Sequence, residues 1–267
     1  MQSFCHVAWE YTMLADLLNR IDANQSIINA CRPFENAGLV KEIRDFYRIG
    51  IVYSSNAIEG YSYTLSETKI LIEDGLTAGG KPLRDAFAVT GLAKAYDYMF
   101  SLLHGSGLTE KDLLAMHGML SNSLENNAKA GAYRDKHVFV TGSRYPVCQP
   151  DEIAAHMDAL FTRERMTRQD EHPVVHAARF HKDLVFIHPF ADGNGRVSRL
   201  AMNILFIQNG YLPVVISPVL RHEYMECLEK AHRNDNDFVI FIARSVIETQ
   251  KDLLRLLRGM PSDRQDA

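Results

Sequence analysis

The stretch HPFADGNGRVSRL, residues 188–200, brings together side chains that can move a proton and hold an anion. The imidazole of His188 is neutral over part of the physiological pH range and can then accept a proton from a hydroxyl group. Asp192 can ligate one Mg²⁺, a cation that favours one or two carboxylates together with phosphate oxygens. Arg196 and Arg199 lie on one side of a helical turn. These side chains are the components of a phosphoryl- or nucleotidyl-transfer site.

The backbone of the same loop is also suited to an anion. Gly193 and Gly195 reach conformations that other residues avoid, and the amides of residues 193–196 lead into a helix start. Such a turn collects N–H donors at the positive end of a helix dipole, where phosphate binds. The two arginines are disfavoured there unless they share an anion. We therefore expect a polyphosphate site, although GxxxxGK(S/T) is absent and no strand precedes the loop.

Helical periodicity dominates the segments that must position this loop. Gly60 and Gly210 are typical helix stops, and Thr109 with Asp112 is typical of a capping box. These signals predict one helix that begins at 150–151, and others over residues 39–60, 85–103, 109–120, 173–188, 199–210, 221–232 and 235–258.

Residues 136–148, KHVFVTGSRYPVC, break this pattern and predict two short strands, HVFV and YPVC, around a turn at 141–144. An isolated two-stranded hairpin is only marginally stable in water. We therefore expect the hairpin to pack on the helices or to bind another molecule. The predicted fold class is all-α with one β-hairpin, in which an N-terminal helical part packs on a central core.

Composition excludes several classes of protein. The chain has 267 residues, and its formal net charge of −4 argues against nucleic-acid and membrane partners. No apolar run reaches the roughly 20 residues that a membrane helix needs. The four cysteines are scattered without a CxxC pair, which suits a reducing compartment. Glu10 and Asp16 interrupt the first apolar segment, so no signal peptide is expected and the predicted location is cytoplasmic.

The loop resembles the signature of a known family. The residues that match the Fic motif HxFx(D/E)GNGRxxR at every fixed position are His188, Phe190, Asp192, Gly193, Asn194, Gly195, Arg196 and Arg199. The resemblance runs from about residue 107 to 210 and also covers SSNAIEG and the hairpin. It implies a Fic (Fido) helical bundle, in which the core holds a flap at 136–148 and a catalytic loop at 188–199. The implied regions are an N-terminal helical region at 1–106, the Fic core at 107–212 and C-terminal helices at 213–267.

This resemblance implies a protein adenylyltransferase, which transfers AMP from ATP to Ser, Thr or Tyr hydroxyls of target proteins and of itself. His188 would deprotonate the hydroxyl, whose oxygen attacks the α-phosphorus of ATP and releases pyrophosphate. Asp192 would hold Mg²⁺, and Asn194 with the glycine amides would stabilise the α-phosphoryl oxygens. Arg196 and Arg199 would bind the β- and γ-phosphates. The implied nucleotide-binding residues are Gly193, Asn194, Gly195, Arg196, Arg199, Val140, Thr141, Gly142 and Tyr224, with Met225 and His232 as further candidates near the adenine.

The resemblance also assigns partners. It makes the hairpin a flap that pairs with the backbone of the target protein, a form of strand addition. Phe190 would pack beneath the loop and fix its shape. Relatives of this kind often form homodimers, so a homodimer is a further expectation.

The stretch SSNAIEG, residues 54–60, contains a second carboxylate of interest. Ser55 and Glu59 share a helix face, and Glu59 lies in the last turn, where the helix dipole disfavours an acid unless a cation is near. On general grounds it is a solvated surface glutamate. The stretch resembles the Fic inhibitory motif (S/T)xxxE(G/N), which implies a bidentate pair between Glu59 and Arg199 that displaces the γ-phosphate. The expected result is an autoinhibited enzyme.

Other functions stay open on these residues. The same fold could remove AMP from targets, with Glu59 positioning water, or transfer another phosphate-containing group. A non-catalytic nucleotide-binding regulator is a third interpretation, which His188 argues against. His176 and His181 lack HExxH spacing and are expected in the core or on the surface, not at a metal. Tyr224 is equally well explained as a core aromatic.

Overall fold

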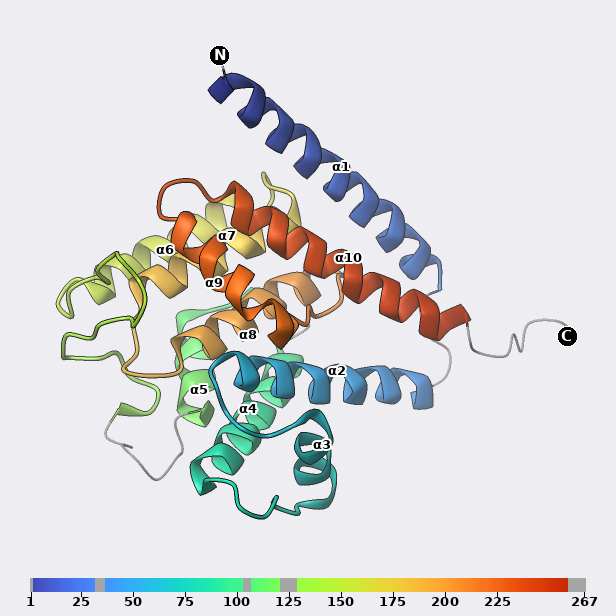
Figure 1. The fold of residues 1–267 in the computed structure, drawn as a ribbon, viewed down its shortest axis with the longest axis vertical. Coiled ribbons are helices and arrows are strands. Elements are labelled where there is room, and N and C mark those ends of the chain that lie inside the picture. Colours follow the sequence, from blue (N-terminus) through green and yellow to red (C-terminus); the bar gives the residue numbers. More distant parts are fainter. Residues whose placement is uncertain (1, 32–36, 103–106, 121–128, 259–267) are drawn as a thin grey trace, which may run out of the picture.

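The computed structural model describes residues 2–31, 37–102, 107–120 and 129–258. The regular structure within these ranges consists of helices, without a β-strand (Figure 1). The all-α prediction is therefore confirmed. None of the described helices is long and apolar enough to cross a membrane.

The observed helices overlap all the predicted spans, and α1 and α3 are additional to them. Their bounds are α1 (Gln2–Ala30), α2 (Ala37–Ile58), α3 (Leu65–Asp74), α4 (Leu83–Ser101), α5 (Glu110–Leu120), α6 (Ile153–Thr167), α7 (Pro173–Ile187), α8 (Asn194–Gln208), the 3₁₀-helix η2 (Pro218–Leu220), α9 (Arg221–Lys230) and α10 (Asn236–Arg258).

Helix α8 is the centre of the fold, and every residue from Arg196 to Phe206 is buried. Helix α7 packs along α8, α10 lies against α7, and α2, α4 and α5 also contact α8 (Figure 1). The core therefore surrounds both helices that flank residues 188–193. The loop between them is anchored in buried helix at each end.

Capping boxes mark two helix starts. At α5 the Thr109 N–H donates to Asp112 Oδ2 at 3.0 Å, and the Asp112 N–H donates to Thr109 Oγ1 at 3.2 Å. Thr64 and Glu67 form the same reciprocal pair at the start of α3. The predicted box at α5 is confirmed, and the second box begins a helix that lies outside the predicted spans.

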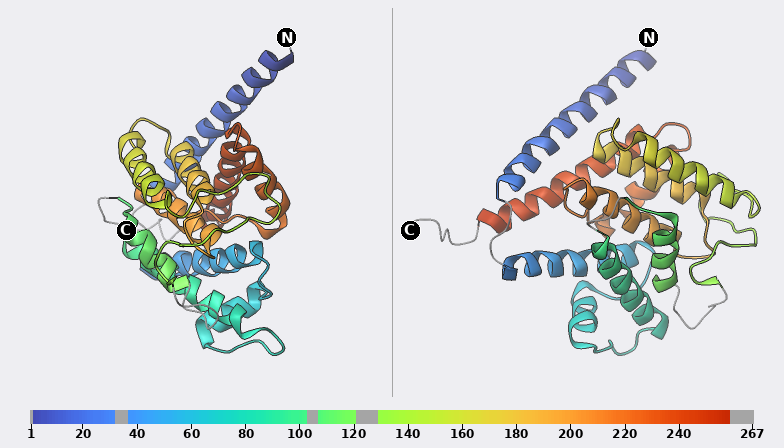
Figure 2. Two further views of the ribbon diagram at one scale, coloured as in Figure 1. Left: turned by 90° about the vertical axis from the view of Figure 1, so that its left-hand side faces the viewer. Right: turned by 180° about the vertical axis from the view of Figure 1, so that it is seen from behind.

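Helix α1 packs along α10, and its N-terminal end projects from the body of the molecule (Figures 1 and 2). Ile21 and Ile28 are fully buried. The side-chain amide of Gln250 on α10 donates to the Ile21 carbonyl at 3.1 Å and to Gln25 Oε1 at 3.2 Å. Segments at opposite ends of the sequence therefore form one helix pair.

Residues 136–148, which we call the flap, do not form the two predicted strands. The predicted turn is present, since the Ser143 N–H donates to the Val140 carbonyl at 3.1 Å and Gly142 has a φ of +89°. Contacts with α9 hold the chain: Ser143 Oγ donates to Glu229 Oε2 at 2.9 Å, and the Arg144 N–H donates to Glu229 Oε1 at 2.8 Å. A two-stranded ribbon is marginal on its own, so these side-chain anchors decide the conformation.

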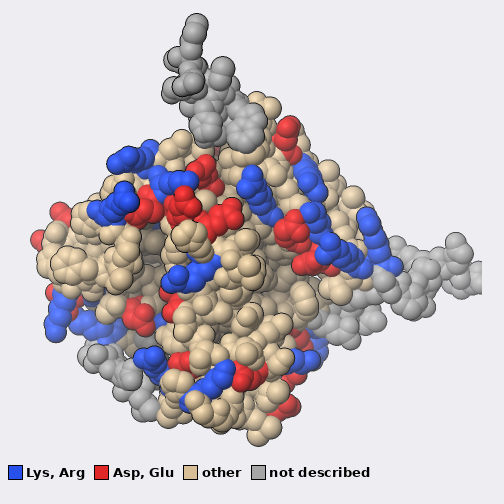
Figure 3. All heavy atoms as spheres, in the orientation of Figure 1, with Lys and Arg blue, Asp and Glu red and all other residues tan. Residues whose placement is uncertain are grey.

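Charges of both signs are interspersed on the face of the molecule seen in Figure 3. Ion pairs such as Arg48–Asp97 and Lys81–Glu67, each at 2.6 Å, join charged side chains of neighbouring helices and loops. The view shows no broad area of one sign. This mixed surface agrees with the modest net charge of −4.

The crossing of α4 and α5 depends on Gly91. A Cβ at this position would lie 2.7 Å from the Met119 carbonyl oxygen, whereas a Cβ at Gly50 on α2 would meet Val215 Cγ2 at an ordinary 3.6 Å. We expect Gly91→Ala to lower the free energy of unfolding by about 1–3 kcal/mol through overpacking. The matched variant Gly50→Ala should leave it unchanged or raise it by up to about 1 kcal/mol. Chemical denaturation measures both, and equal stabilities would contradict this account.

Candidate active site

His188 ends α7 in a left-handed backbone conformation. Its φ is 52° and its ψ is 57°, and it is the one non-glycine residue with positive φ in the described part of the chain. Such a conformation costs roughly 1–2 kcal/mol for a residue that has a Cβ, so its surroundings must hold it. The His188 N–H donates to the Leu184 carbonyl at 3.1 Å and caps the helix. Strain of this kind is typical of functional sites.

The ring of His188 is arranged as a base. Nδ1 lies 3.2 Å from the Val185 carbonyl oxygen, and because a carbonyl can only accept, Nδ1 carries the hydrogen. Nε2 then holds the lone pair. Burial lowers the pKa of His188 below its ordinary value, which keeps the ring neutral at pH 7. This tautomer can accept a proton from a hydroxyl group at Nε2.

Arg134 joins the flap to the catalytic loop. This guanidinium is buried, and its Nε donates to the His188 carbonyl at 2.8 Å. Nη1 donates to the Lys136 carbonyl at 3.0 Å, and Nη2 donates to the Cys148 carbonyl at 2.5 Å. One side chain therefore closes both ends of the flap and contacts the backbone of the base. Arg134 was not among the predicted site residues, although its position just before the flap could have indicated a role there.

His117 on α5 supports the loop from below. Its ring stacks on Phe190, with centroids 3.8 Å apart and planes 8° from parallel. The Gly131 N–H donates to Nδ1 at 3.0 Å, so Nε2 carries the hydrogen and donates to the Asp192 carbonyl at 3.1 Å. Burial lowers the pKa of His117 to about 4, and the neutral ring serves as a fixed brace. His117 was not predicted, because its spacing in the sequence relates it to no other site residue.

Asn194 binds the backbone of its own loop. Its Oδ1 accepts from the Phe190 N–H at 2.9 Å, and its Nδ2 donates to the Phe190 carbonyl at 2.8 Å. The side chain is buried and closes the loop on itself, and its predicted contact with the α-phosphate stays a prediction. The N–H and the carbonyl of Phe190 are buried backbone groups that need hydrogen-bond partners, and Asn194 supplies both. The donors left for an anion are the amides at the start of α8.

Asp192 and Arg196 lie at the rim of the loop. Arg196 Nη2 donates to Asp192 Oδ2 at 3.0 Å, and the Asp192 side chain is 84% exposed whereas that of Arg196 is 4% exposed. In the described part of the chain no group of three or more His, Cys, Asp or Glu residues forms a metal site. A single accessible carboxylate nevertheless fits Mg²⁺, because that ion takes its remaining ligands from phosphate and water.

Arg199 is buried against the last turns of α2. Its Nε donates to Ser55 Oγ at 2.8 Å, and its Nη2 donates to the Ser55 carbonyl at 2.9 Å and to Glu59 Oε1 at 2.6 Å. Glu59 thus lies beside Arg199, the cationic partner that the resemblance of residues 54–60 to the inhibitory motif predicted. The contact is not the bidentate pair that was predicted, because Ser55 and the Tyr224 hydroxyl accept from the other donors of the guanidinium.

The carboxylate of Glu59 also packs against the first turn of α8, next to Gly195. A Cβ at Gly195 would be 2.5 Å from Glu59 Oε1 and 3.0 Å from Arg199 Nη1, so only glycine leaves room for them. Gly193, with a φ of +81°, is the N-cap of the same helix. Backbone amides and the positive end of the helix dipole favour an anion at this point. Glu59 is the anion that the structure places there.

Tyr224 is buried beside Arg199, and its predicted contact with a nucleotide stays a prediction. Its side chain is 1% exposed, and its ring packs against Phe238 and Phe241. The hydroxyl accepts from Arg199 Nη1 at 3.4 Å and lies at hydrogen-bond distance, 2.8 Å, from His181 Nε2. Burial lowers the pKa of His181 to about 3, so that ring is neutral at pH 7. These surroundings agree with the core-aromatic alternative.

The remaining predicted residues lie outside this buried cluster. Val140, Thr141 and Gly142 are exposed on the flap. Met225 is half-buried, and His232 is stacked between Phe186 on α7 and Tyr145 on the flap, at centroid distances of 3.6 and 4.0 Å. Flap, α7 and the end of α9 thus meet at His232.

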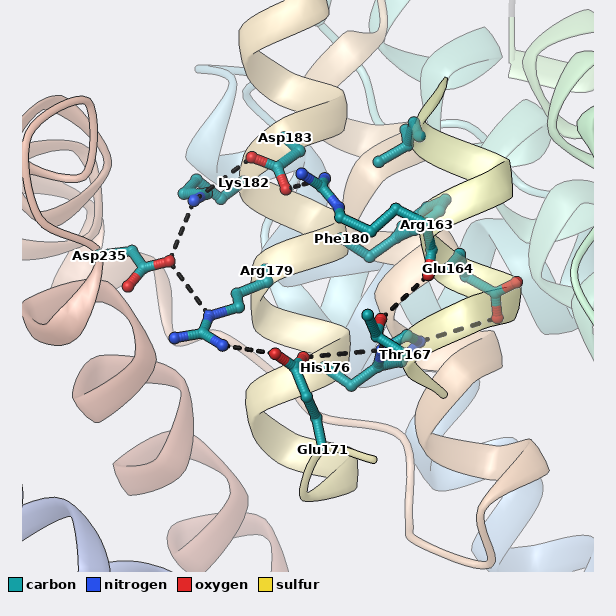
Figure 4. Close-up of a pocket in the computed structure, with 11 residues that line it drawn as sticks. Arg163, Glu164, Thr167, Glu171, His176, Arg179, Phe180, Lys182, Asp183 and Asp235 are labelled. Atoms are coloured by element: carbon teal, nitrogen blue, oxygen red, sulfur yellow. Dashed lines mark hydrogen bonds and ion pairs between the residues drawn. The ribbon is translucent and has the colours of Figure 1, made fainter. Parts of the chain in front are cut away.

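A polar pocket of about 270 Å³ lies apart from the catalytic loop, between α6, α7 and the segment before α10 (Figure 4). Its cations are already paired: Arg179 with Glu171 at 2.5 Å, and Lys182 with Asp235 at 3.0 Å. Arg163 likewise contacts Asp183. The network therefore ties α7, which leads to His188, to its neighbours, and it offers no unpaired cation to an anion.

Comparison with known proteins identifies the domain that contains the loop. Residues 107–206 match the family model described as the Fic/DOC family. The chain is 33% identical over 239 residues to a protein named protein adenylyltransferase Fic from Nematostella vectensis, covering 88% of this chain and 55% of that protein. It is 33% identical over 231 residues to the protein of the same name from Culex quinquefasciatus, covering 84% of this chain and 45% of that one. The chain thus spans about half the length of these relatives.

Solved structures give the same fold. Fic-1 from C. elegans superposes with a TM-score of 0.82 at 24% identity, over 96% of this chain and 75% of that one. A Fic domain containing signaling protein from Bacteroides thetaiotaomicron superposes with a TM-score of 0.80 at 22% identity, over 92% of this chain and 100% of that one. With the loop from His188 to Arg199 inside the matched residues, the chain carries a domain of the Fic/DOC family.

Proposed function

We propose that this protein transfers AMP from ATP to hydroxyl groups of target proteins, and that Glu59 restrains the reaction. The observation that carries the proposal is the Glu59 carboxylate, which lies against Gly195 and 2.6 Å from Arg199. An internal anion in that position marks the site that a phosphate would occupy. The adenylyltransferase names of the relatives support the same activity.

The reaction follows from the neutral ring of His188. Nε2 takes the proton of the target hydroxyl, and the oxygen attacks the α-phosphorus of ATP. The bond from that phosphorus to the bridging oxygen breaks, and pyrophosphate leaves. The amides at the start of α8 stabilise charge on the phosphoryl oxygens, and Arg196 and Arg199 bind the departing phosphates. Arg134 and His117 contribute by keeping the loop backbone in place.

Asp192 is the residue that would hold Mg²⁺ in this scheme. Its exposed carboxylate lies next to Arg196, at the side of the loop where the phosphates would bind. Bound Mg²⁺ would offset the charge that develops on the phosphate oxygens.

The target protein is proposed to dock on the flap. Phe139 is 95% exposed and Val140 is 37% exposed there, and an exposed apolar side chain on a supported loop suits a protein partner. The mixed charges in Figure 3 give no support to a nucleic-acid partner.

Removal of AMP is a second candidate, and the position of Glu59 favours it. A carboxylate beside the phosphate site could orient a water molecule for attack on an AMP-modified target. Both reactions would use the same loop, so their balance would depend on whether Glu59 stays in place.

We expect Glu59→Gly to raise AMP transfer to a target or to the protein itself by about 10- to 100-fold, the factor that corresponds to one hydrogen bond between charged groups. Labelled ATP with Mg²⁺ measures the transfer. Glu73→Gly is the matched control, because Glu73 is also in the last turn of a helix but its carboxylate pairs with the exposed Lys69. Equal labelling of the Glu59→Gly protein and the unmodified protein would refute the restraint.

We expect Glu59→Gly/His188→Ala to bind ATP and to transfer no AMP, since His188 supplies the base and the loop supplies the anion site. Calorimetric titration with ATP measures the binding in the same preparation. Undiminished transfer would exclude His188 as the base. Binding without transfer in the single variant Glu59→Gly as well would favour the non-catalytic regulator.

The pH dependence follows from the lowered pKa of His188. The base is active when unprotonated, so a folded pKa below the ordinary value of roughly 6.5 extends activity to lower pH. Glu59 raises this pKa, so its removal lowers it further. We expect kcat/KM of Glu59→Gly to be constant from about pH 8 to 6.5 and to fall below that with unit slope. An acid limb centred above roughly pH 6.5 would contradict the assignment.

A further inference from the structure

The ring of Tyr61 lies against the guanidinium of Arg196, just outside the signature. The Arg196 Cζ is 5.0 Å from the centre of the ring. Tyr61 is half-buried, whereas Arg196 is buried. Burial raises the pKa of the Tyr61 hydroxyl, so the ring is uncharged at neutral pH. The contact is therefore a cation–π interaction and not an ion pair.

The end of α2 fixes where Tyr61 lies. Gly60 has a φ of +89°, its N–H donates to the Ala57 carbonyl at 3.0 Å, and the Tyr61 N–H donates to the Asn56 carbonyl at 3.2 Å. This is a Schellman motif, which reverses the chain in a defined direction after a helix. One helix end therefore delivers Glu59 to one motif arginine and Tyr61 to the other.

The two contacts differ in kind. Glu59 and Ser55 accept hydrogen bonds from the edge of Arg199, where the N–H donors that would bind phosphate are located. Tyr61 instead contacts Arg196 through its ring, while Nη2 of Arg196 donates to Asp192 Oδ2. The Nε of Arg196 is buried and has no hydrogen-bond partner. A buried charged donor of this kind calls for an acceptor, and a phosphate oxygen of the nucleotide is suited to that place.

We propose that Tyr61 is a positioning residue that holds the Arg196 guanidinium, with its Nε left unpaired, for the distal phosphates of ATP. This inference rests on the proposed adenylyltransferase function and adds a residue that prepares the same site. Tyr61 supports Arg196 whether or not Glu59 engages Arg199. Residues 59–61 at the end of α2 would therefore restrain the site through Glu59 and prepare it through Tyr61.

The test uses the full chain with Glu59→Gly, and compares Tyr61 with Tyr61→Phe and Tyr61→Leu. Calorimetry gives the affinities for ATP and for AMP, and labelling gives kcat and KM. We expect Tyr61→Leu to weaken ATP binding about tenfold and Tyr61→Phe to stay within about twofold, because phenylalanine keeps the ring face. AMP affinity should not change, because AMP lacks the phosphates that Arg196 would bind.

Two controls separate positioning from folding. Tyr98→Leu removes another half-buried tyrosine, whose hydroxyl donates to Asp112 at 2.8 Å. Because this tyrosine does not contact Arg196, the substitution should leave the affinity for ATP unchanged. In an Arg196→Met background, Tyr61→Leu should add no further loss, since the two residues act as one unit.

Several results would overturn the inference. They are unchanged or tighter ATP binding by Tyr61→Leu, an equal loss of ATP and AMP affinity, or an additive loss in the Arg196→Met background. If the Glu59→Gly protein bound ATP but transferred no AMP, the proposed function would fail, and the ATP affinities would still decide the role of Tyr61.

Discussion

The guanidinium of Arg199, buried where α8 meets α2, is the group on which the rest of the site depends. It is 4% exposed, and a charge in such a place is stable only with hydrogen-bonded partners of suitable sign. Ser55 and Glu59 supply them in this structure. In the proposed function a triphosphate would supply others, so nucleotide binding would exchange one anion for another. Glu59 would then be both a competitor of ATP and the group that stabilises the Arg199 charge when no nucleotide is bound.

Preorganisation of the loop comes from buried side chains that bind its backbone. Arg134 reaches the carbonyl of His188, His117 reaches that of Asp192, and Asn194 bonds both polar groups of Phe190. Each satisfies main-chain groups that would otherwise be unpaired in a water-poor region. These contacts hold the left-handed turn at His188, so that in the proposed reaction the ring would meet a hydroxyl without rearrangement.

Sequence reasoning reached the parts of the site that local spacing defines. Ser55 and Glu59 are four positions apart, so their shared face could be inferred, and the glycines after Asp192 indicated an anion site. Spacing does not predict which neighbour a helix face contacts, so the hydrogen bonds of Asn194 with Phe190 and of Tyr224 with Arg199 could not be inferred from the sequence. The prediction of two strands in the flap was wrong, because the alternation of apolar and polar residues along 136–148 does not reveal the hydrogen bonds of Ser143 and Arg144 with Glu229. Helix α3 was missed although its T-x-x-E box was visible.

The contacts of Arg134 with the flap have an evolutionary consequence. They go to main-chain oxygens at Lys136 and Cys148, and every amino acid carries such an oxygen. Most side chains between these two points can therefore be replaced without disturbing the geometry behind them. If the flap binds the target protein as proposed, mutations in this stretch would change the preference for partners while leaving the neighbouring loop unchanged.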